Sequence, residues 1–299
     1  MAPMTVRIGI NPITWSNDDL PELGGETPLE TCLAETRQAG YAGIELGNKF
    51  PRRAEALRPI LARHELALVS GWYSGMLLTR SVAEEIAAID DHLALLAALG
   101  CDVLIFAETT GSVAGSRATA LSRRPRLAEG DWTDFAAKLT AIADHLARRG
   151  VAMAFHHHMG TVIETPEEID RLMAMTGKAV GLLLDTGHLV YAGGDPLAVA
   201  RRHIARINHV HCKDVRRLVL ERVRARDSSF LDAVVDGVFT VPGDGSIDYA
   251  PLFAVLKGAS YQGWLVVEAE QDPAKAHPLT YARMGYDYLR ETTEAAGLI

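Results

Sequence analysis

The sequence predicts a closed (β/α)8 barrel, or TIM barrel, on the basis of three observations. Eight short, mostly apolar segments recur along the 299 residues, and helical patterns fill the intervals between them. Apolar runs without alternation are typical of parallel strands that are covered on both faces. The length of 299 residues is normal for one such barrel. We therefore expect a single α/β domain over residues 1–299, built from right-handed strand–helix–strand crossovers.

The strands of this barrel are expected wherever an apolar run lies between turn signals. The main alternative is a doubly wound open sheet, which usually has a glycine-rich first turn. The segment GINPITW after the first run has no GxGxxG pattern, and this favours the barrel. The eight expected strands cover residues 6–12, 42–47, 66–72, 101–108, 151–158, 180–187, 207–214 and 263–270.

Helix signals separate the expected strands. The sequences TPLE at 27–30 and TPEE at 165–168 each combine a Thr cap, a Pro at the first helical position and a Glu three residues after the Thr. Asp195 before Pro196 is a similar start signal. Glycines end several helical runs just before a strand, where a left-handed cap costs little. They are Gly40, Gly100, Gly150 and Gly177.

The longest stretches expected to be irregular are 109–130 and 215–248. Both follow the carboxyl end of a strand, where barrel enzymes place their substrate loops.

Composition and charge exclude several classes of protein. The net charge of −8 disfavours binding to a phosphate backbone, so we expect no nucleic-acid partner. The three cysteines are widely spaced, which favours a reducing compartment, and we expect a cytoplasmic protein. The first residues, MAPMTVRIGI, have no long apolar segment after a basic start, so we expect no signal peptide. No window approaches the roughly 20 apolar residues of a membrane span, so no membrane partner is expected.

Polar side chains gather where the expected strands end, although the strands are otherwise apolar. Because side chains alternate between the two faces of a strand, His156 and His158 share one face and His157 takes the other. His157 is expected to be a hydrogen-bonded core residue. The full set of polar residues at strand ends is Asn11, Glu45, Trp72, Glu108, His156, His158, Asp185, His188, His211, Lys213 and Glu268.

Four of these residues form a candidate metal site with one ligand from each of the last four strands: His156, Asp185, His211 and Glu268. Two imidazoles and two carboxylates suit Mn²⁺, Co²⁺, Zn²⁺ or Fe²⁺. A single buried histidine is more often a hydrogen-bonded core residue than a metal ligand. The prediction of a metal site therefore rests on the four residues together. His158 and His188 can either orient ligands or bind substrate. Glu45 and Glu108 can alternatively pair with a lysine such as Lys49.

Several motifs resemble a known family. LLLDTGH, HVHCKD and VVEAEQD resemble signatures of the xylose-isomerase-like barrel superfamily. The longer motifs GINPITWSNDDLPELGG, GIELGNKFPR, FHHHMGT and LLLDTGHLVYAGGDP are similar to the inosose dehydratases of inositol catabolism, and the similarity extends from Gly9 almost to the C-terminus. The superfamily usually has Glu in an ExH pattern at the end of the fifth strand. Here that place reads HHH, so either His156 or His158 can be the ligand.

This resemblance implies a metal-dependent dehydratase, a carbon–oxygen lyase. It would convert scyllo-inosose (2-keto-myo-inositol) to 3D-3,5/4-trihydroxycyclohexane-1,2-dione and water. The implied cofactor is Mn²⁺ or Co²⁺, and glutathione is also associated with the family. The implied partner is a small cyclic polyol ketone, and a homo-oligomer is possible by analogy.

Roles for the remaining candidates follow from this reaction. We expect His158, His188 and Lys213 to be catalytic. We expect the substrate to be bound by Glu45, Trp72, Glu108 and Arg217, with Arg216 as a further loop candidate. A divalent-metal sugar isomerase or epimerase is the main alternative function. A DNA-repair nuclease and a non-catalytic sugar-binding barrel are two others.

Overall fold

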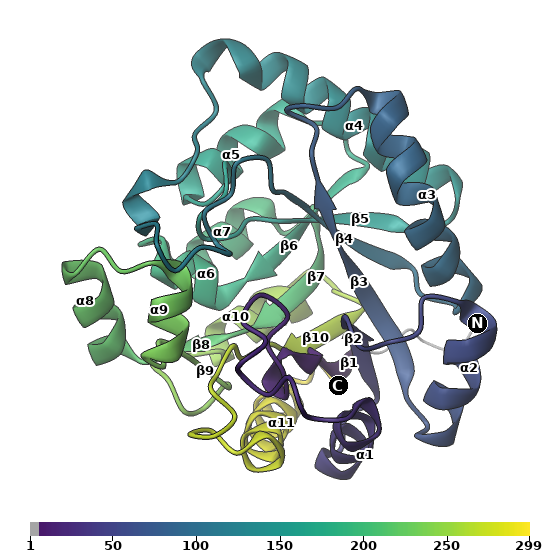
Figure 1. The fold of residues 1–299 in the computed structure, drawn as a ribbon, viewed down its shortest axis with the longest axis vertical. Helices are drawn as coiled ribbons and strands as arrows, with labels where there is room; N and C mark the ends of the chain where they lie inside the picture. The colour runs from purple at the N-terminus through teal and green to yellow at the C-terminus, as the bar shows by residue number, and fades with distance from the viewer. Residues whose placement is uncertain (1–5) are drawn as a thin grey trace.

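The computed structural model describes residues 6–299 and contains a closed barrel of eight parallel strands (Figure 1). The order around the barrel is β1-β10-β7-β6-β5-β4-β3-β2, which confirms the predicted fold class and all eight expected strands. The strands are β1 (Arg7–Ile10), β2 (Gly43–Leu46), β3 (Ala67–Gly75), β4 (Val103–Glu108), β5 (Ala152–His156), β6 (Val180–Asp185), β7 (Ile207–Cys212) and β10 (Trp264–Val267).

Small and medium apolar side chains fill the barrel interior. Val103, Ile105, Ala154 and Leu183 form one buried cluster from neighbouring strands. Because side chains alternate along a strand, the inward-facing positions continue along β5 from Ala154 to residue 156, and along β6 from Leu183 to residue 185. The interior is therefore packed like a core up to the ends of the strands, where polar residues take over.

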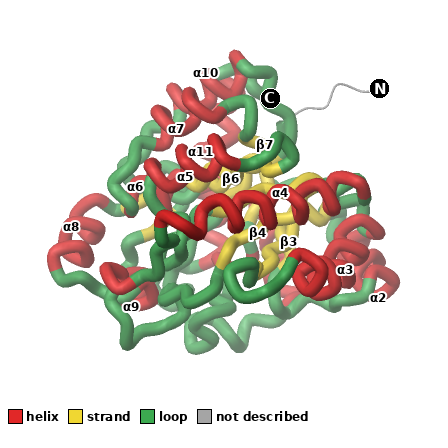
Figure 2. Tube along the Cα trace, turned by 90° about the horizontal axis from the view of Figure 1, so that it is seen from above, coloured by secondary structure: helices red, strands yellow, loops and turns green. Residues whose placement is uncertain are grey.

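The helices form a layer outside the barrel, and the loops that follow the strands lie on the side opposite the C-terminus (Figure 2). The helices are α1 (Leu29–Ala39), α2 (Ala54–Arg63), α3 (Val82–Ala98), α4 (Trp132–Arg148), α5 (Pro166–Met175), α6 (Thr186–Tyr191), α7 (Pro196–His203), α8 (Arg217–Ala225), α9 (Phe230–Val235), α10 (Ala250–Gly258) and α11 (Pro278–Ala295). Short 3-10 turns occur at η1 (Pro12–Thr14), η2 (Leu121–Arg123) and η3 (Glu129–Asp131).

Two of the three predicted helix starts are confirmed. Thr165 and Glu168 form a capping box at α5, and the Asp195 side chain accepts a hydrogen bond from the backbone N–H of Leu197 at α7. The prediction for Thr27 was wrong. The cap position of α1 is occupied by Pro28, which has no side-chain acceptor, so the helix begins one residue later than the motif suggested.

The expectation that residues 215–248 are irregular was also wrong. It contains α8, α9 and a two-stranded antiparallel ribbon of β8 (Asp214–Val215) and β9 (Phe239–Thr240), and α8 and α9 stand to one side of the barrel in Figure 1. Phe230, Leu231 and Phe239 are buried in a second apolar cluster there. This local burial stabilises helices too short to be recognised from periodicity.

The cysteines and the helix lengths complete the description of the fold. All three cysteines are free and buried, so no disulfide framework is present. None of the helices within residues 6–299 combines the length and the apolar character needed to cross a membrane.

Gly40 and Gly100 provide a matched test of how the helices end. Both have positive φ, +108° at Gly40 and +76° at Gly100. A Cβ at Gly40 would lie 2.6 Å from the Tyr286 ring, whereas a Cβ at Gly100 would meet nothing within 4 Å. We expect Gly100→Ala to lower the free energy of unfolding by about 1–2 kcal/mol, the cost of a left-handed Ala. Gly40→Ala should cost more, and urea unfolding of both variants compares them.

Candidate metal centre and cavity

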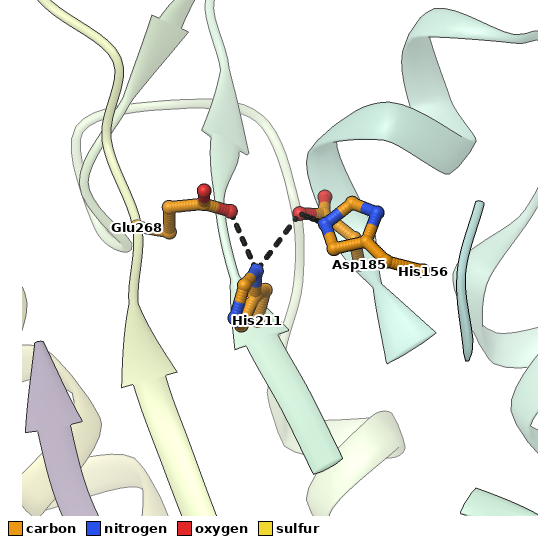
Figure 3. Close-up of side chains that lie close together, drawn as sticks. All are labelled: His156, Asp185, His211 and Glu268. Atoms are coloured by element: carbon orange, nitrogen blue, oxygen red, sulfur yellow. Dashed lines mark ion pairs between the residues drawn. The ribbon is translucent and has the colours of Figure 1, made fainter. Parts of the chain in front are cut away.

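Four polar side chains converge at the carboxyl ends of four adjacent strands (Figure 3). His156 ends β5, Asp185 ends β6, His211 lies in β7, and Glu268 follows β10. The parallel register places Asp185 directly beside His211, so their inward-pointing side chains meet. The structure therefore brings together all four residues of the predicted set.

The four donor atoms lie close enough to share one ion. His211 Nδ1 is 2.6 Å from Glu268 Oε2 and 3.5 Å from Asp185 Oδ2. His156 Nε2 is 3.5 Å from the same Asp185 oxygen. All four atoms lie within 4.8 Å of one another, and all four residues are buried.

The hydrogen bonding of these atoms supports a cation. Each of the four lacks a hydrogen-bond partner among residues 6–299, because even the 2.6 Å approach of His211 to Glu268 does not have hydrogen-bond geometry. Buried polar atoms without partners are costly and need an explanation. A set of two imidazole nitrogens and two carboxylate oxygens is typical of Mn²⁺, Co²⁺, Zn²⁺ or Fe²⁺ sites. The residues present therefore fit a divalent cation.

The opposite atoms of three of these side chains are fixed by hydrogen bonds. His156 Nδ1 donates to the carbonyl of His157 (2.6 Å), which leaves Nε2 with a free lone pair. Asp185 Oδ1 accepts from the backbone N–H of His188 (2.8 Å) and so also caps α6. His211 Nε2 lies 3.1 Å from Glu45 Oε1. Such contacts orient metal ligands and select the tautomer of a histidine.

Glu45 lies beneath this cluster and does not line the cavity. Its Oε1 also accepts from Ser70 Oγ (2.5 Å) and His209 Nε2 (2.9 Å), and its Oε2 accepts from Asn11 Nδ2 (2.7 Å). Burial alone would raise its pKa, but the charge of His211 and the histidine hydrogen bonds hold the pKa well below its ordinary value. The predicted substrate contact is therefore replaced by an orienting contact to His211.

The surroundings of His211 are negative. Burial alone would lower the pKa of its imidazole, but the charges of Glu268 and Glu45 raise that pKa well above its ordinary value. The same two carboxylates that favour a proton on His211 also favour a bound cation.

His158, His188 and Lys213 lie together next to the cluster. The rings of His158 and His188 are 4.0 Å apart, and Lys213 Nζ donates to His188 Nε2 at 3.2 Å. Burial, followed by the positive charge of Lys213, lowers the pKa of His158 to about 3. Burial and the charge of Lys213 also lower the pKa of His188 well below its ordinary value. Both imidazoles are therefore neutral near pH 7. His158 Nδ1 donates to the Met159 carbonyl (2.8 Å), which leaves its Nε2 free to accept a proton, whereas Lys213 already occupies Nε2 of His188.

Lys213 is fully buried and remains charged. Its Nζ lies 3.3 Å from Glu268 Oε2 and 3.4 Å from Glu270 Oε1. Burial lowers the pKa of Lys213, but these two carboxylates raise it above its ordinary value. Gly187 makes room for the lysine stem, because a Cβ there would lie 2.5 Å from Lys213 Cγ.

A cavity of about 390 Å³ opens above these groups. Its lining includes Trp72, His158, Glu268 and Glu270. Trp72 is 39 % exposed, and its ring packs edge-on against His156 and His158 at centroid distances of 5.4 and 5.7 Å. Further polar lining residues are Asn11, Asp18, Asp19, Asn48, Arg52, Ser74, Thr109 and Ser112.

Glu108 and Arg217, both predicted to bind substrate, lie outside this cavity. The Glu108 oxygens accept from the backbone N–H groups of Leu77 (2.8 Å) and Thr110 (3.0 Å), so Glu108 holds loops. Arg217 begins α8 and lines a separate cavity of about 450 Å³ beside α7 and α10. Arg216 donates to the Gly237 and Phe239 carbonyls. The α8–α9 excursion, which the sequence did not predict, directs both arginines away from the barrel mouth.

Sequence reasoning missed two residues of this region. His209 contacts Glu45, and Glu270 lines the cavity beside Lys213. The signal was present in both cases, because each lies two residues from a proposed ligand, and His209 shares a strand face with His211. His157 is a buried core residue, as expected, and its Nε2 accepts from the backbone N–H of Asp185 (3.3 Å).

Substitution of the proposed ligands should remove a bound metal. We expect His211→Ala and Glu268→Gln each to lower the Mn²⁺ content of protein loaded with Mn²⁺ and then dialysed, from about one ion per chain to a small fraction of that. The measurement is elemental analysis by mass spectrometry. His277→Ala, at an exposed histidine, is the matched control. Unchanged Mn²⁺ content in either ligand variant would refute the ligand assignment.

Comparison with known proteins identifies the family. The family described as xylose isomerase-like TIM barrel matches residues 33–292. The rhizopine catabolism protein MocC of Rhizobium meliloti is 54% identical over 294 residues, covering 98% of this chain and 90% of that protein. An inosose dehydratase of Geobacillus thermodenitrificans is 47% identical over 289 residues, covering 96% of this chain and 97% of that protein.

Solved structures agree on the fold. An L-ribulose 3-epimerase is 18% identical with a TM-score of 0.69, covering 98% of this chain and 96% of that one. A probable 3-DHS dehydratase of Bacillus anthracis is 12% identical with a TM-score of 0.70, covering 95% and 99%. At such identities the likeness concerns the fold alone. The near full-length relatives are closer, and they show that the chain belongs to the xylose isomerase-like TIM-barrel family and, within it, to the inosose dehydratases, which are hydro-lyases.

Proposed function

We propose that this enzyme dehydrates scyllo-inosose to 3D-3,5/4-trihydroxycyclohexane-1,2-dione in myo-inositol catabolism. One observation supports the proposal above all. Four side chains that fit a divalent cation lie next to the neutral imidazoles of His158 and His188 and the buried ammonium of Lys213, at a polar cavity. The substrate is inferred from relatives named inosose dehydratase at 41–47% identity. The relative at 54% identity is named for rhizopine catabolism, and for that reason the pathway is tested separately from the reaction.

The proposed cofactor is Mn²⁺ or Co²⁺, held by His156, Asp185, His211 and Glu268. When bound, such an ion supplies a Lewis acid toward the ketone oxygen of the substrate. Glu45, His188 and His157 contribute the contacts that keep three of these ligands in one orientation.

The chain's own groups handle two protons in the reaction. One proton leaves the carbon beside the ketone, and the hydroxyl on the next carbon leaves as water after taking up a proton. A carbon–carbon double bond forms in the resulting enol, which tautomerises to the dione. His158 is the proposed base, because it lines the cavity and is neutral near pH 7. Catalysis of each such proton transfer typically raises the reaction rate by about 10²–10⁴-fold.

The other two groups support this step. His188 lies behind His158 and keeps it positioned through ring contact at 4.0 Å. Lys213 is the proposed group that assists departure of the hydroxyl, and its charge offsets those of Glu268 and Glu270. Trp72 is the proposed flat wall for the ring of the substrate.

Incubation of the purified protein with scyllo-inosose tests the reaction. With Mn²⁺ or Co²⁺ present, we expect ultraviolet absorbance from a dione, and we expect chelator to abolish it. A sugar isomerase or epimerase would instead interconvert ketoses without this chromophore. Metal-dependent ketose interconversion and no dione would replace the proposed function with that alternative. Growth of a deletion strain on myo-inositol and on rhizopine distinguishes the two pathways.

His158→Ala tests the proposed base. We expect this variant to keep its Mn²⁺, because His156 is the proposed ligand at the end of β5, and to lose at least 10²-fold in kcat. His277→Ala should keep full activity. Retained turnover in the His158 variant would refute His158 as the base, and loss of Mn²⁺ would identify His158 as the ligand after the fifth strand.

A further inference from the structure

A second polar cluster lies beside the metal centre. His158, His188 and Glu270 each offer one atom within 4.8 Å of the others, and all three residues are buried. By spacing alone this group resembles a second cation site. Glu270 lies two residues beyond Glu268 in the chain, and both carboxylates lie within 3.4 Å of Lys213 Nζ.

Lys213 already fills the cation position of this second cluster. Its Nζ lies 3.2 Å from His188 Nε2 and 3.4 Å from Glu270 Oε1. It also lies 3.3 Å from Glu268 Oε2, and its stem is seated against Gly187. A divalent ion in the same place would meet a fixed positive charge at contact distance. A second metal therefore does not explain why Glu270 is buried here.

One oxygen of Glu270 remains available. Oε1 faces Lys213, whereas Oε2 is buried and finds no hydrogen-bond donor in any of residues 6–299. The Glu270 side chain lines the same cavity as Trp72 and His158. A buried acceptor without a hydrogen bond destabilises the folded protein, unless a bound molecule supplies the donor. A polyol in this cavity carries several hydroxyl donors.

We propose that Glu270 is a specificity-determining residue whose Oε2 accepts a hydrogen bond from one ring hydroxyl of the substrate. The identity of the ring as a cyclic polyol rests on the proposed function. Lys213 fixes the carboxylate through Oε1, so Oε2 is held in place before the substrate arrives. A site built around such an acceptor rejects an analogue that lacks the hydroxyl, because the acceptor is then buried without a partner.

Calorimetric titration with a non-reacting polyol tests the proposal. Mn²⁺-loaded wild type, Glu270→Ala and Glu270→Gln are titrated with myo-inositol and with its monodeoxy analogues. We expect one analogue to bind wild type roughly 10- to 100-fold more weakly than myo-inositol, as for a buried acceptor left without its hydrogen-bond partner. That difference should shrink to about threefold or less in Glu270→Ala, as in a double-mutant cycle. Glu270→Gln, which keeps an acceptor oxygen, should restore part of the discrimination, and Glu221→Ala, at an exposed glutamate of α8, is the control.

Three results would overturn the assignment. The first is equal discrimination among the analogues by wild type and Glu270→Ala. The second is a loss of Mn²⁺ from Glu270→Ala by elemental analysis, since Glu270 would then be a ligand. The third is the absence of myo-inositol binding to wild type. If the discrimination depends on Glu270 but the protein does not dehydrate scyllo-inosose, the proposed function is refuted and the role of Glu270 is not.

Discussion

The register between β6 and β7 is the constraint on which the rest of the site depends. Asp185 pairs with His211 across these strands. The donors on either side are staggered, because His156 of β5 pairs with Leu183 and Glu268 lies two residues beyond Val266, the β10 partner of His211. In a closed barrel the strands cannot slide independently, because each is hydrogen-bonded on both sides. The donors of β5, β6 and β7 can then meet without a loop to position them, and Glu268 follows directly after β10. A shift of one residue in any of the four strands would turn its donor toward the helix layer.

Polar groups surround the four donors in layers, and each layer contacts the one inside it. Glu45 engages His211, and Asn11, Ser70 and His209 in turn engage Glu45. On the cavity side, Lys213 balances the charges of Glu268 and Glu270. The carboxylates and the positive groups alternate in space. This alternation keeps a densely charged region buried in which isolated charges would not be tolerated.

The sequence was most informative where periodicity and burial coincide. The eight strands and the four donor residues follow from apolar runs that end in a polar residue, because alternation alone decides which side chains face inward. It was least informative where contacts join distant loops. Arg217 was assigned to the substrate on its position after β7, and only the burial of Phe230 and Phe239 in the α8–α9 excursion explains why it points elsewhere. Glu108 was misjudged for the same reason, since its partners are backbone N–H groups of loops whose paths the sequence does not define.

The two oxygens of the Asp185 carboxylate have different partners. One oxygen, Oδ2, faces the other three donors, and Oδ1 receives the N–H of His188 at the start of α6. A cation held by Oδ2 would therefore be connected to the first turn of α6, which carries His188, through a single planar group.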